Sequence, residues 1–458
     1  MSRASHKLLT RRWFTGALLT AGLLASTCVP VTAADRVRKV TSPGGIEAWL
    51  MESHEVGLIS MRFNFEGGAL AEPAEKPGVA QFAAYMFNEG AGDMTPEVLS
   101  SRRMKLGVNL GGSADYKYSS ISFSTPSINR SEAFALLREA IHKPRFDAEP
   151  IERARREYEA SLTAEQKQPG SIAVNHLRRK LLGGTRFASS LYGTLETLGT
   201  INRSDIEAYR QRSFARSNLK VAVAGDITAA ELGPLLDDLV AGLPERTAVP
   251  KGPATPTQSG SDAVLPMELP QTTVMFGNAA ARLDWRQSLA YAIGNDILSG
   301  DSTSRLFREV REKRGLVYGI NTGRSEAGDV SVFITSFGAG IDNVAPALDV
   351  ARQEISRFLA EGPTEDEMET VKSSFAGSFF LGLDTNEKLV SQVQWMLRDN
   401  LPITYLDDYV AALEKITAAD VKAVMNHAIK PELFNTVVVG KTPADFRLDG
   451  RPATPPVQ

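Results

Sequence analysis

The chain has 458 residues, too many for one small hydrophobic core, so two or more domains are expected. Apolar residues make up 43% of the chain and charged residues 23%, as in an ordinary soluble globular protein. The formal net charge of −3 shows no basic excess, so we expect no nucleic acid and no anionic lipid surface as a partner.

The first 34 residues have the organisation of a signal peptide. Lys7, Arg11 and Arg12 precede an apolar run from Phe14 to Leu24, and small residues follow up to Ala34. The apolar run is too short to span a bilayer, and the small residues suit a cleavage site. The arginine pair also resembles a twin-arginine signal, although adjacent arginines are common in such segments. We expect export, by the Sec or the twin-arginine route, rather than a retained anchor.

The only cysteine of the chain, Cys28, lies inside this segment. Cleavage after Ala33 or Ala34 leaves a mature chain without a disulfide, a thiol nucleophile or a cysteine metal site. A lipoprotein would need Cys28 as its lipidated residue, but residues 25–27 match such a site poorly, so this is a minor alternative. Cleavage also removes four basic residues and no acidic ones, which changes the net charge from −3 to −7. No other segment is apolar and long enough to cross a membrane.

Strands and amphipathic helices are mixed along the first half of the mature chain. Residues 46–50 and 58–65 alternate apolar and polar side chains, as half-buried strands do. Residues 130–143 carry apolar side chains on one helical face, and residues 149–168 read as a long charged helix. Because strands and helices do not alternate strictly, we expect an α+β fold with antiparallel sheets.

An internal repeat relates the two halves of the chain. Residues 201–225 and 416–440 match without a gap at an offset of 215, with an isoleucine, an aspartate and a glycine at equivalent places. In each copy a Ser or Thr ahead of an Asp is expected to cap a helix. A β-branched run then predicts a buried strand that ends at the glycine. A match of this kind indicates duplication.

The segment between the two halves has the composition of a linker. It is rich in proline, glycine, serine and threonine and has no hydrophobic periodicity. The expected organisation is a signal peptide at 1–34, a first domain at 37–242, a linker at 243–263, a second domain at 264–446 and a tail at 447–458.

Two motifs carry chemical information. In the first half, residues 67–80 lead from a strand through a loop into a helix that continues as Gln81-Phe82-Ala83-Ala84-Tyr85. In the second half, the sequence runs Ser304-Arg305-Leu306-Phe307 and then, after three residues, Arg311-Glu312-Lys313-Arg314-Gly315-Leu316-Val317-Tyr318.

These motifs resemble those of the pitrilysin/insulysin zinc peptidases, peptidase family M16. In that family the first motif continues into H-x-x-E-H, whose two histidines share one helical face and grip zinc while the glutamate activates water. Here Gln81 and Tyr85 stand in place of the histidines and Ala84 in place of the glutamate. A neutral amide is a poor zinc ligand and alanine cannot take up a proton, so the resemblance implies a degenerate zinc motif.

No other metal site is expected in the chain. The family's third ligand is a glutamate near the position of Glu159, which we interpret as a solvated helical charge because one carboxylate does not hold zinc. No two histidines stand at helical spacing or in a ligand cluster: they are His6, His54, His142, His176 and His427. The sequence also has no G-x-S-x-G motif, phosphate loop or dinucleotide fingerprint.

The second motif falls on the family's S-R-L-F…R…G-L-x-Y pattern. Arg311 and Tyr318 match its substrate-binding arginine and tyrosine, which reach across the chamber to the peptide at the facing zinc. Charge pattern alone would place Arg311 in a solvated run, but the nearly complete motif favours the functional interpretation. Residues 111–123 match a family edge strand that pairs with extended peptide, and without zinc beside it we expect a structural role here.

The resemblance covers nearly the whole mature chain and implies a half-clamshell that works with a second subunit. We expect the inactive subunit of a heterodimeric metalloendopeptidase, not catalytic alone, without a cofactor of its own. Its expected partners are a homologous zinc-bearing H-x-x-E-H subunit and a peptide substrate, in the bacterial periplasm. An alternative is a non-enzymatic scaffold or peptide-binding protein, like the core proteins of respiratory complexes. A presequence-recognising processing subunit ranks lower, because residues 298–303 form only a short loop.

Overall fold

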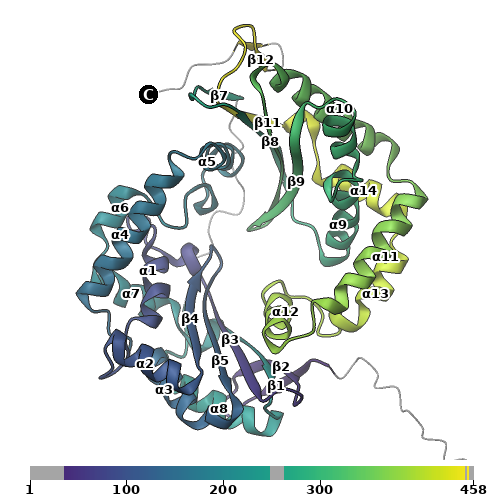
Figure 1. The fold of residues 1–458 in the computed structure, drawn as a ribbon. Helices are drawn as coiled ribbons and strands as arrows, with labels where there is room; N and C mark the ends of the chain where they lie inside the picture. Colours follow the sequence, from purple (N-terminus) through teal and green to yellow (C-terminus); the bar gives the residue numbers. More distant parts are fainter. Residues whose placement is uncertain (1–35, 248–261, 449–450, 453–458) are drawn as a thin grey trace, which may run out of the picture.

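The computed structural model describes residues 36–247, 262–448 and 451–452 (Figure 1). The expected signal peptide and most of the expected linker and tail lie outside these residues, and the expected domain boundaries stay predictions. The first half contains β1 (Arg38–Thr41), β2 (Glu47–Glu52), β3 (Leu58–Glu66), α1 (Val79–Tyr85), α2 (Pro96–Leu106), β4 (Asn109–Ala114), β5 (Tyr118–Pro126), α3 (Arg130–His142), α4 (Ala148–Glu165), α5 (Pro169–Leu182), α6 (Leu195–Thr200), α7 (Arg203–Ser213), β6 (Leu219–Gly225) and α8 (Ala229–Val240).

The second half repeats this plan. It contains β7 (Ala263–Leu265), β8 (Thr272–Ala281), α9 (Trp285–Ser299), the π-helical turn η7 (Phe307–Glu312), β9 (Val317–Ala327), β10 (Val330–Ala339), α10 (Val344–Glu361), α11 (Glu365–Leu381), α12 (Asn386–Arg398), α13 (Tyr405–Lys415), α14 (Ala418–Ala428), β11 (Asn435–Val439), β12 (Arg447–Leu448) and β13 (Arg451–Pro452). No helix in the described part of the chain is both long and apolar enough to span a bilayer.

Each half is built on one sheet. The strand order is β1-β2-β6-β3-β5-β4 in the first sheet and β7-β11-β8-β10-β9 in the second. Most neighbours are antiparallel, and one pair in each sheet is parallel: β2 with β6, and β7 with β11. The expected α+β fold of two tandem domains is confirmed, with these parallel pairs as an addition. In each sheet the last strand, β4 or β9, pairs on one side only.

The duplicated segments form the same helix–strand pair in both halves. The first copy is α7 followed by β6, and the second is α14 followed by β11. In the second copy Thr417 caps the helix in a reciprocal arrangement with Asp420. In the first copy the cap is Asn202 rather than the expected serine, because the Asn202 side chain accepts the backbone N–H groups of Ser204 and Asp205. The apolar side chains of both copies are buried: Ile206, Tyr209, Phe214, Val421 and Val424.

The two halves exchange one helix each. Helix α5 belongs to the first half but packs on β8 and β11 of the second sheet, and α12 of the second half packs on β2, β3 and β6 (Figure 1). Leu177 of α5 is fully buried in a cluster with Val437 of β11, and Val390 of α12 is fully buried with Ala222 of β6. This exchange explains why β6 and β11 are buried on both faces, as their continuous apolar runs predict.

Candidate functional site

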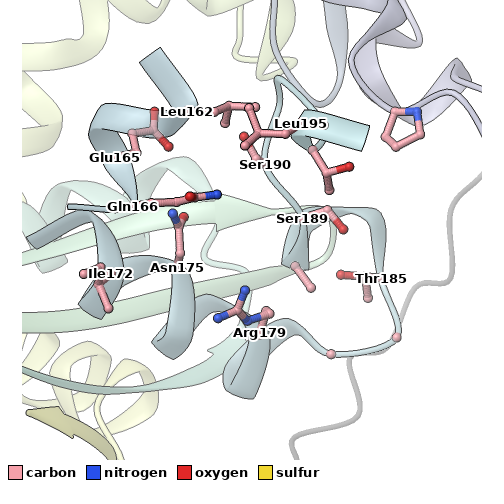
Figure 2. A pocket seen from close by; sticks show the side chains of 16 residues that line it. Leu162, Glu165, Gln166, Ile172, Asn175, Arg179, Thr185, Ser189, Ser190 and Leu195 are labelled. Atoms are coloured by element: carbon pink, nitrogen blue, oxygen red, sulfur yellow. The ribbon is translucent and has the colours of Figure 1, made fainter. Parts of the chain in front are cut away.

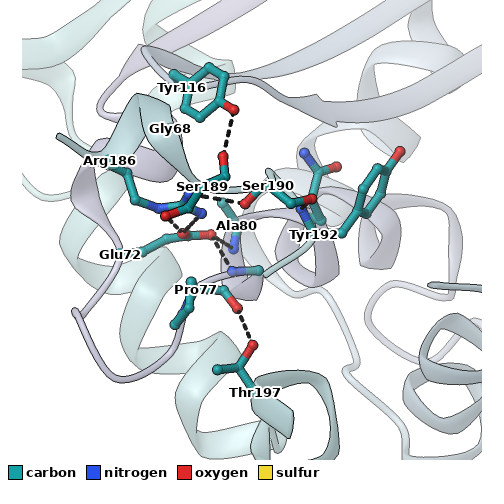
Figure 3. Close-up of polar contacts among 12 residues, drawn as sticks. Gly68, Glu72, Pro77, Ala80, Tyr116, Arg186, Ser189, Ser190, Tyr192 and Thr197 are labelled. Carbon is teal, nitrogen blue, oxygen red and sulfur yellow. Dashed lines mark hydrogen bonds and ion pairs between the residues drawn. The ribbon is translucent and has the colours of Figure 1, made fainter. Parts of the chain in front are cut away.

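The start of helix α1 is fixed by a buried carboxylate. Glu72, whose side chain is 1% exposed, accepts the backbone N–H groups of Gly78 and Ala80, both at 3.0 Å. It also pairs with Arg186 at 2.7 Å (Figure 3). Burial raises the pKa of Glu72, and the arginine together with the two amides opposes that rise. The carboxylate therefore satisfies donors that a helix start would otherwise leave unpaired.

The degenerate zinc motif lies on this helix and makes structural contacts. The side-chain amide of Gln81 donates to the carbonyl of Ala114 on β4 at 2.7 Å. The Tyr85 hydroxyl donates to Glu157 on α4 at 3.2 Å. Ala84 is buried, and its carbonyl lies only 2.0 Å from where a Cβ at Gly112 would stand, so β4 can approach the helix only with glycine there. Helix and edge strand are thus packed directly together.

Aromatic rings fill the space beside the motif. Tyr158 of α4 packs edge-on against Phe82 and Tyr85, with centroids 5.3 and 6.1 Å away, and its ring lies 5.0 Å from that of Tyr192. Its hydroxyl donates to the Gln81 carbonyl at 3.1 Å. Burial raises the pKa values of both Tyr85 and Tyr158, so these phenols stay protonated and act as donors.

The residues at this place do not fit zinc. The donor set is an amide already engaged with a carbonyl, a methyl group and a protonated phenol, none of which is a good zinc ligand. Glu159 lies partly exposed on α4, and nothing in the structure tests our interpretation of it as a solvated charge. Within residues 36–247 and 262–448 there is no group of three or more His, Cys, Asp or Glu side chains that could hold a metal.

The structure brings Arg311 and Tyr318 together. The guanidinium carbon of Arg311 lies 4.6 Å from the Tyr318 ring centroid and 4.7 Å from that of Phe307. Arg311 belongs to η7, where the wider π-helical spacing is typical of functional positions. Tyr318 stands at the start of the edge strand β9 and is 79% exposed. An arginine held between two rings in this way keeps its N–H donors at its rim available.

Three of the four neighbouring cations are engaged by carboxylates. Arg305 is buried and binds Glu367 at 2.7 Å. Lys313 and Arg314 both bind Glu309, at 2.6 and 2.7 Å, and these two bonds lower the pKa of Glu309 to about 2. Arg311 has no carboxylate partner among the described residues. The charged run therefore divides into three cations with carboxylate partners, the exposed Arg308, and Arg311, which lies between two aromatic rings.

Several contacts had no sequence signal. The Glu72–Arg186 pair joins residues 114 positions apart, which no local pattern reveals. His54 binds Asp226 at 2.7 Å and lies 3.8 Å from Glu52, because the ends of neighbouring strands β2 and β6 bring these side chains together. The sequence does show that each of these residues is charged or titratable, but only the sheet order makes them neighbours.

Fold and site together define a class of protein: a two-domain half-clamshell of the zinc-peptidase type whose own zinc helix lacks ligands. Residues 52–195 match the insulinase domain (peptidase family M16), and residues 200–375 match the peptidase M16 inactive domain. The chain belongs to peptidase family M16. Within the family it is an inactive homologue.

Known relatives are similar over most of their length. The non-peptidase homolog YmxG of Helicobacter pylori is 22% identical over 387 residues, which span 80% of this chain and 88% of the relative. YmxG of Bacillus subtilis, described as an uncharacterized zinc protease, is 20% identical over 358 residues, 77% of this chain and 86% of the relative. The crystal structure of a peptidase M16 inactive domain from Pseudomonas fluorescens has a TM-score of 0.84 at 26% identity, and the match covers 90% of this chain and all of that one.

Proposed function

We propose that this chain is the non-catalytic subunit of a heterodimeric zinc metallopeptidase. It closes a peptide chamber against a homologous H-x-x-E-H subunit and presents Arg311 and Tyr318 to the peptide bound there. One observation carries the proposal: helix α1 lacks zinc ligands, while in the second half the half-buried Arg311 is held against Tyr318, which is 79% exposed.

The proposed chemistry needs only these two side chains from this subunit. The guanidinium donates to a peptide carbonyl and offers positive charge to the oxygen that becomes negative during hydrolysis. The tyrosine hydroxyl is a second donor at the same place. Zinc in the partner would polarise the carbonyl and activate water, and this chain would act by positioning and electrostatics.

The proposed location is the periplasm. The support is the signal-like sequence of residues 1–34, with Arg11 and Arg12 ahead of an apolar run. Fractionation of cells that produce the full chain would test it: we expect a shortened chain in the periplasmic fraction. Full-length chain in the cytoplasm would contradict this part of the proposal without affecting the rest.

The decisive experiment is reconstitution. The tagged chain, captured from its native host, should bring down an H-x-x-E-H protein in equimolar amount, which mass spectrometry identifies. The chain alone should show no peptidase activity and no change in melting temperature with a chelator. Addition of the chain to the purified partner should raise peptide hydrolysis strongly.

Variants of the pair make the test specific. Arg311→Ala should lower the activity of the complex at least tenfold without changing how much complex forms. Arg308→Ala is the matched control, because this exposed arginine stands in the same turn. Chelator-sensitive cleavage by the chain alone would overturn the proposal. Complex formation with no effect of Arg311→Ala would instead favour the non-enzymatic scaffold.

A further inference from the structure

A large hollow in the described part of the chain lies away from both motifs. It has a volume of about 850 Å³ and is formed by the end of α4, one face of α5 and the segment from Gly183 to Leu195 (Figure 2). This volume falls within the ~300–1,000 Å³ range typical of small-molecule sites. None of its lining residues belongs to α1, to η7 or to β9.

The wall made by residues 183–195 is held rigidly. Arg186 binds the buried Glu72 and also donates to the Ser190 carbonyl at 3.0 Å. The Tyr116 hydroxyl donates to the Ser189 carbonyl at 2.7 Å (Figure 3). On the second half, the Phe187 ring lies 3.2 Å from where a Cβ at Gly328 would stand. The cavity is therefore preformed, and ligand binding would not have to order this segment first.

Two side chains of opposite charge line the cavity, each from a different helix. Arg179 comes from α5 and Glu165 from the end of α4, and neither has an ion-pair partner among the described residues. The amides of Asn175 and Gln166 lie between them in the view of Figure 2. Ile172 of α5 adds an apolar surface at one side.

We propose that this cavity binds a short peptide with free termini. The Arg179 guanidinium matches the geometry of a terminal carboxylate, and the Glu165 carboxylate accepts a terminal ammonium group. Asn175 and Gln166 have the donors and acceptors that peptide groups need, and the apolar side takes up a small side chain. A phosphate-rich ligand is disfavoured, because the single arginine is opposed by a carboxylate. The site goes beyond the proposed function, since it needs neither the partner nor Arg311.

Calorimetry on the purified chain tests this site, with tetra-alanine as the probe. We expect saturable binding in the micromolar to millimolar range. Arg179→Gln should weaken it at least tenfold, because a charge-assisted bidentate contact is lost. Lys167→Gln is the matched control: it removes one positive charge just beyond the end of α4 without touching the lining, and should change affinity less than twofold.

Blocked peptides assign the two charges. Tetra-alanine with an amidated C-terminus should bind the unaltered chain about as weakly as the free peptide binds Arg179→Gln, and should lose nothing further from that substitution. N-acetylated tetra-alanine should bind the unaltered chain about as weakly as the free peptide binds Glu165→Gln, and Glu165→Gln should not weaken its binding further. Equal binding of free and doubly blocked peptides, or equal effects of Arg179→Gln and Lys167→Gln, would overturn the proposal.

Hydrogen exchange locates the ligand independently of any variant. Saturating tetra-alanine should slow amide exchange in residues 183–195 of the unaltered chain. Protection confined to β4 or β9 would mean that the peptide binds at the edge strand of a sheet, and would overturn the proposal. Absence of saturable binding to a chain with a cooperative thermal transition would do the same. Neither result bears on the activity of a reconstituted complex.

Discussion

The guanidinium of Arg311 lies 4.6 Å from the ring centroid of Tyr318, so these two residues form one unit although they are seven positions apart in the sequence. The ring orients the arginine, and the hydroxyl adds a donor beside it. The unit therefore has two separable properties, which substitutions at Tyr318 can tell apart.

Tyr318→Phe should lower kcat of the reconstituted complex about tenfold, because it removes the hydroxyl and keeps the ring. Tyr318→Ala should have a larger effect, close to that of Arg311→Ala, because the arginine loses its support as well. Steady-state kinetics on a peptide substrate measures both. The melting temperature of the isolated chain should not change, since the Tyr318 side chain is 79% exposed. Identical kinetics for the Phe and Ala variants would show that the ring does not position Arg311.

Breaking the buried ion pair should destabilise the first half. Arg186→Met leaves the Glu72 carboxylate, 1% exposed, without its cation and should cost roughly 3–5 kcal/mol. The substitution also raises the pKa of Glu72 further, because burial is then less opposed. At acidic pH the carboxyl is protonated in the variant and the deficit shrinks. Urea unfolding at pH 5 and pH 8 should therefore show the larger loss at pH 8, and an equal loss at both would contradict this account.

His54 should make stability depend on pH in a defined direction. The hydrogen bond to Asp226, with a smaller effect of Glu52, raises the pKa of His54 above 6.5. Protonation therefore favours the folded chain: the contribution is complete below pH 6.5 and is lost as pH rises through the raised pKa. Titration of the imidazole by NMR should give a value above 6.5 in the unaltered chain and a lower one in Asp226→Asn. A His54 pKa that Asp226→Asn leaves unchanged would contradict the assignment.

The helix exchange predicts an effect across the molecule. Leu177→Ala in α5 should cost about 2–5 kcal/mol, because the side chain is fully buried. The lost protection should appear in β8 and β11 of the second half, where α5 packs, more than in the first sheet. Hydrogen exchange read by mass spectrometry resolves this. Arg178→Ala, the next residue on a less buried face of α5, is the matched control and should leave protection in both sheets near that of the unaltered chain.

Much of the fold could be predicted from local patterns. The alternating run at 58–65 became β3, and the duplicated segments became α7 with β6 and α14 with β11. The alternation at 58–65 predicts a strand correctly, but the expected half-burial is wrong: the polar side chains Ser60, Arg62 and Asn64 are buried too, because α12 packs on β3. The prediction of a serine N-cap in the first copy was wrong. Asn202 and Ser204 are both good capping residues, and only the backbone geometry distinguishes them.

The site was less accessible from sequence. The spacing of Arg311 and Tyr318 gave their place in a motif, but not the cation–π contact, which depends on how η7 turns into β9. The packing partner of α5 could not be predicted either. The apolar face of α5 indicates that a sheet packs on the helix, but not which of the two sheets does so. The role of Arg311 and Tyr318 in substrate binding stays a prediction.

The exchange of α5 and α12 also bears on how such a chain can arise. Before duplication, a single half would carry a helix that does not pack on its own sheet. Its sheet would in turn need a helix from another copy to cover one face. Two copies of this half could cover each other's sheets by exchanging the helix, as domain-swapped dimers do. Fusion of the genes would then free each copy to diverge, since the covalent link keeps the trade intact. One half could lose its metal ligands while the other kept an arginine and a tyrosine, and each sheet would still be covered by the helix of the other half.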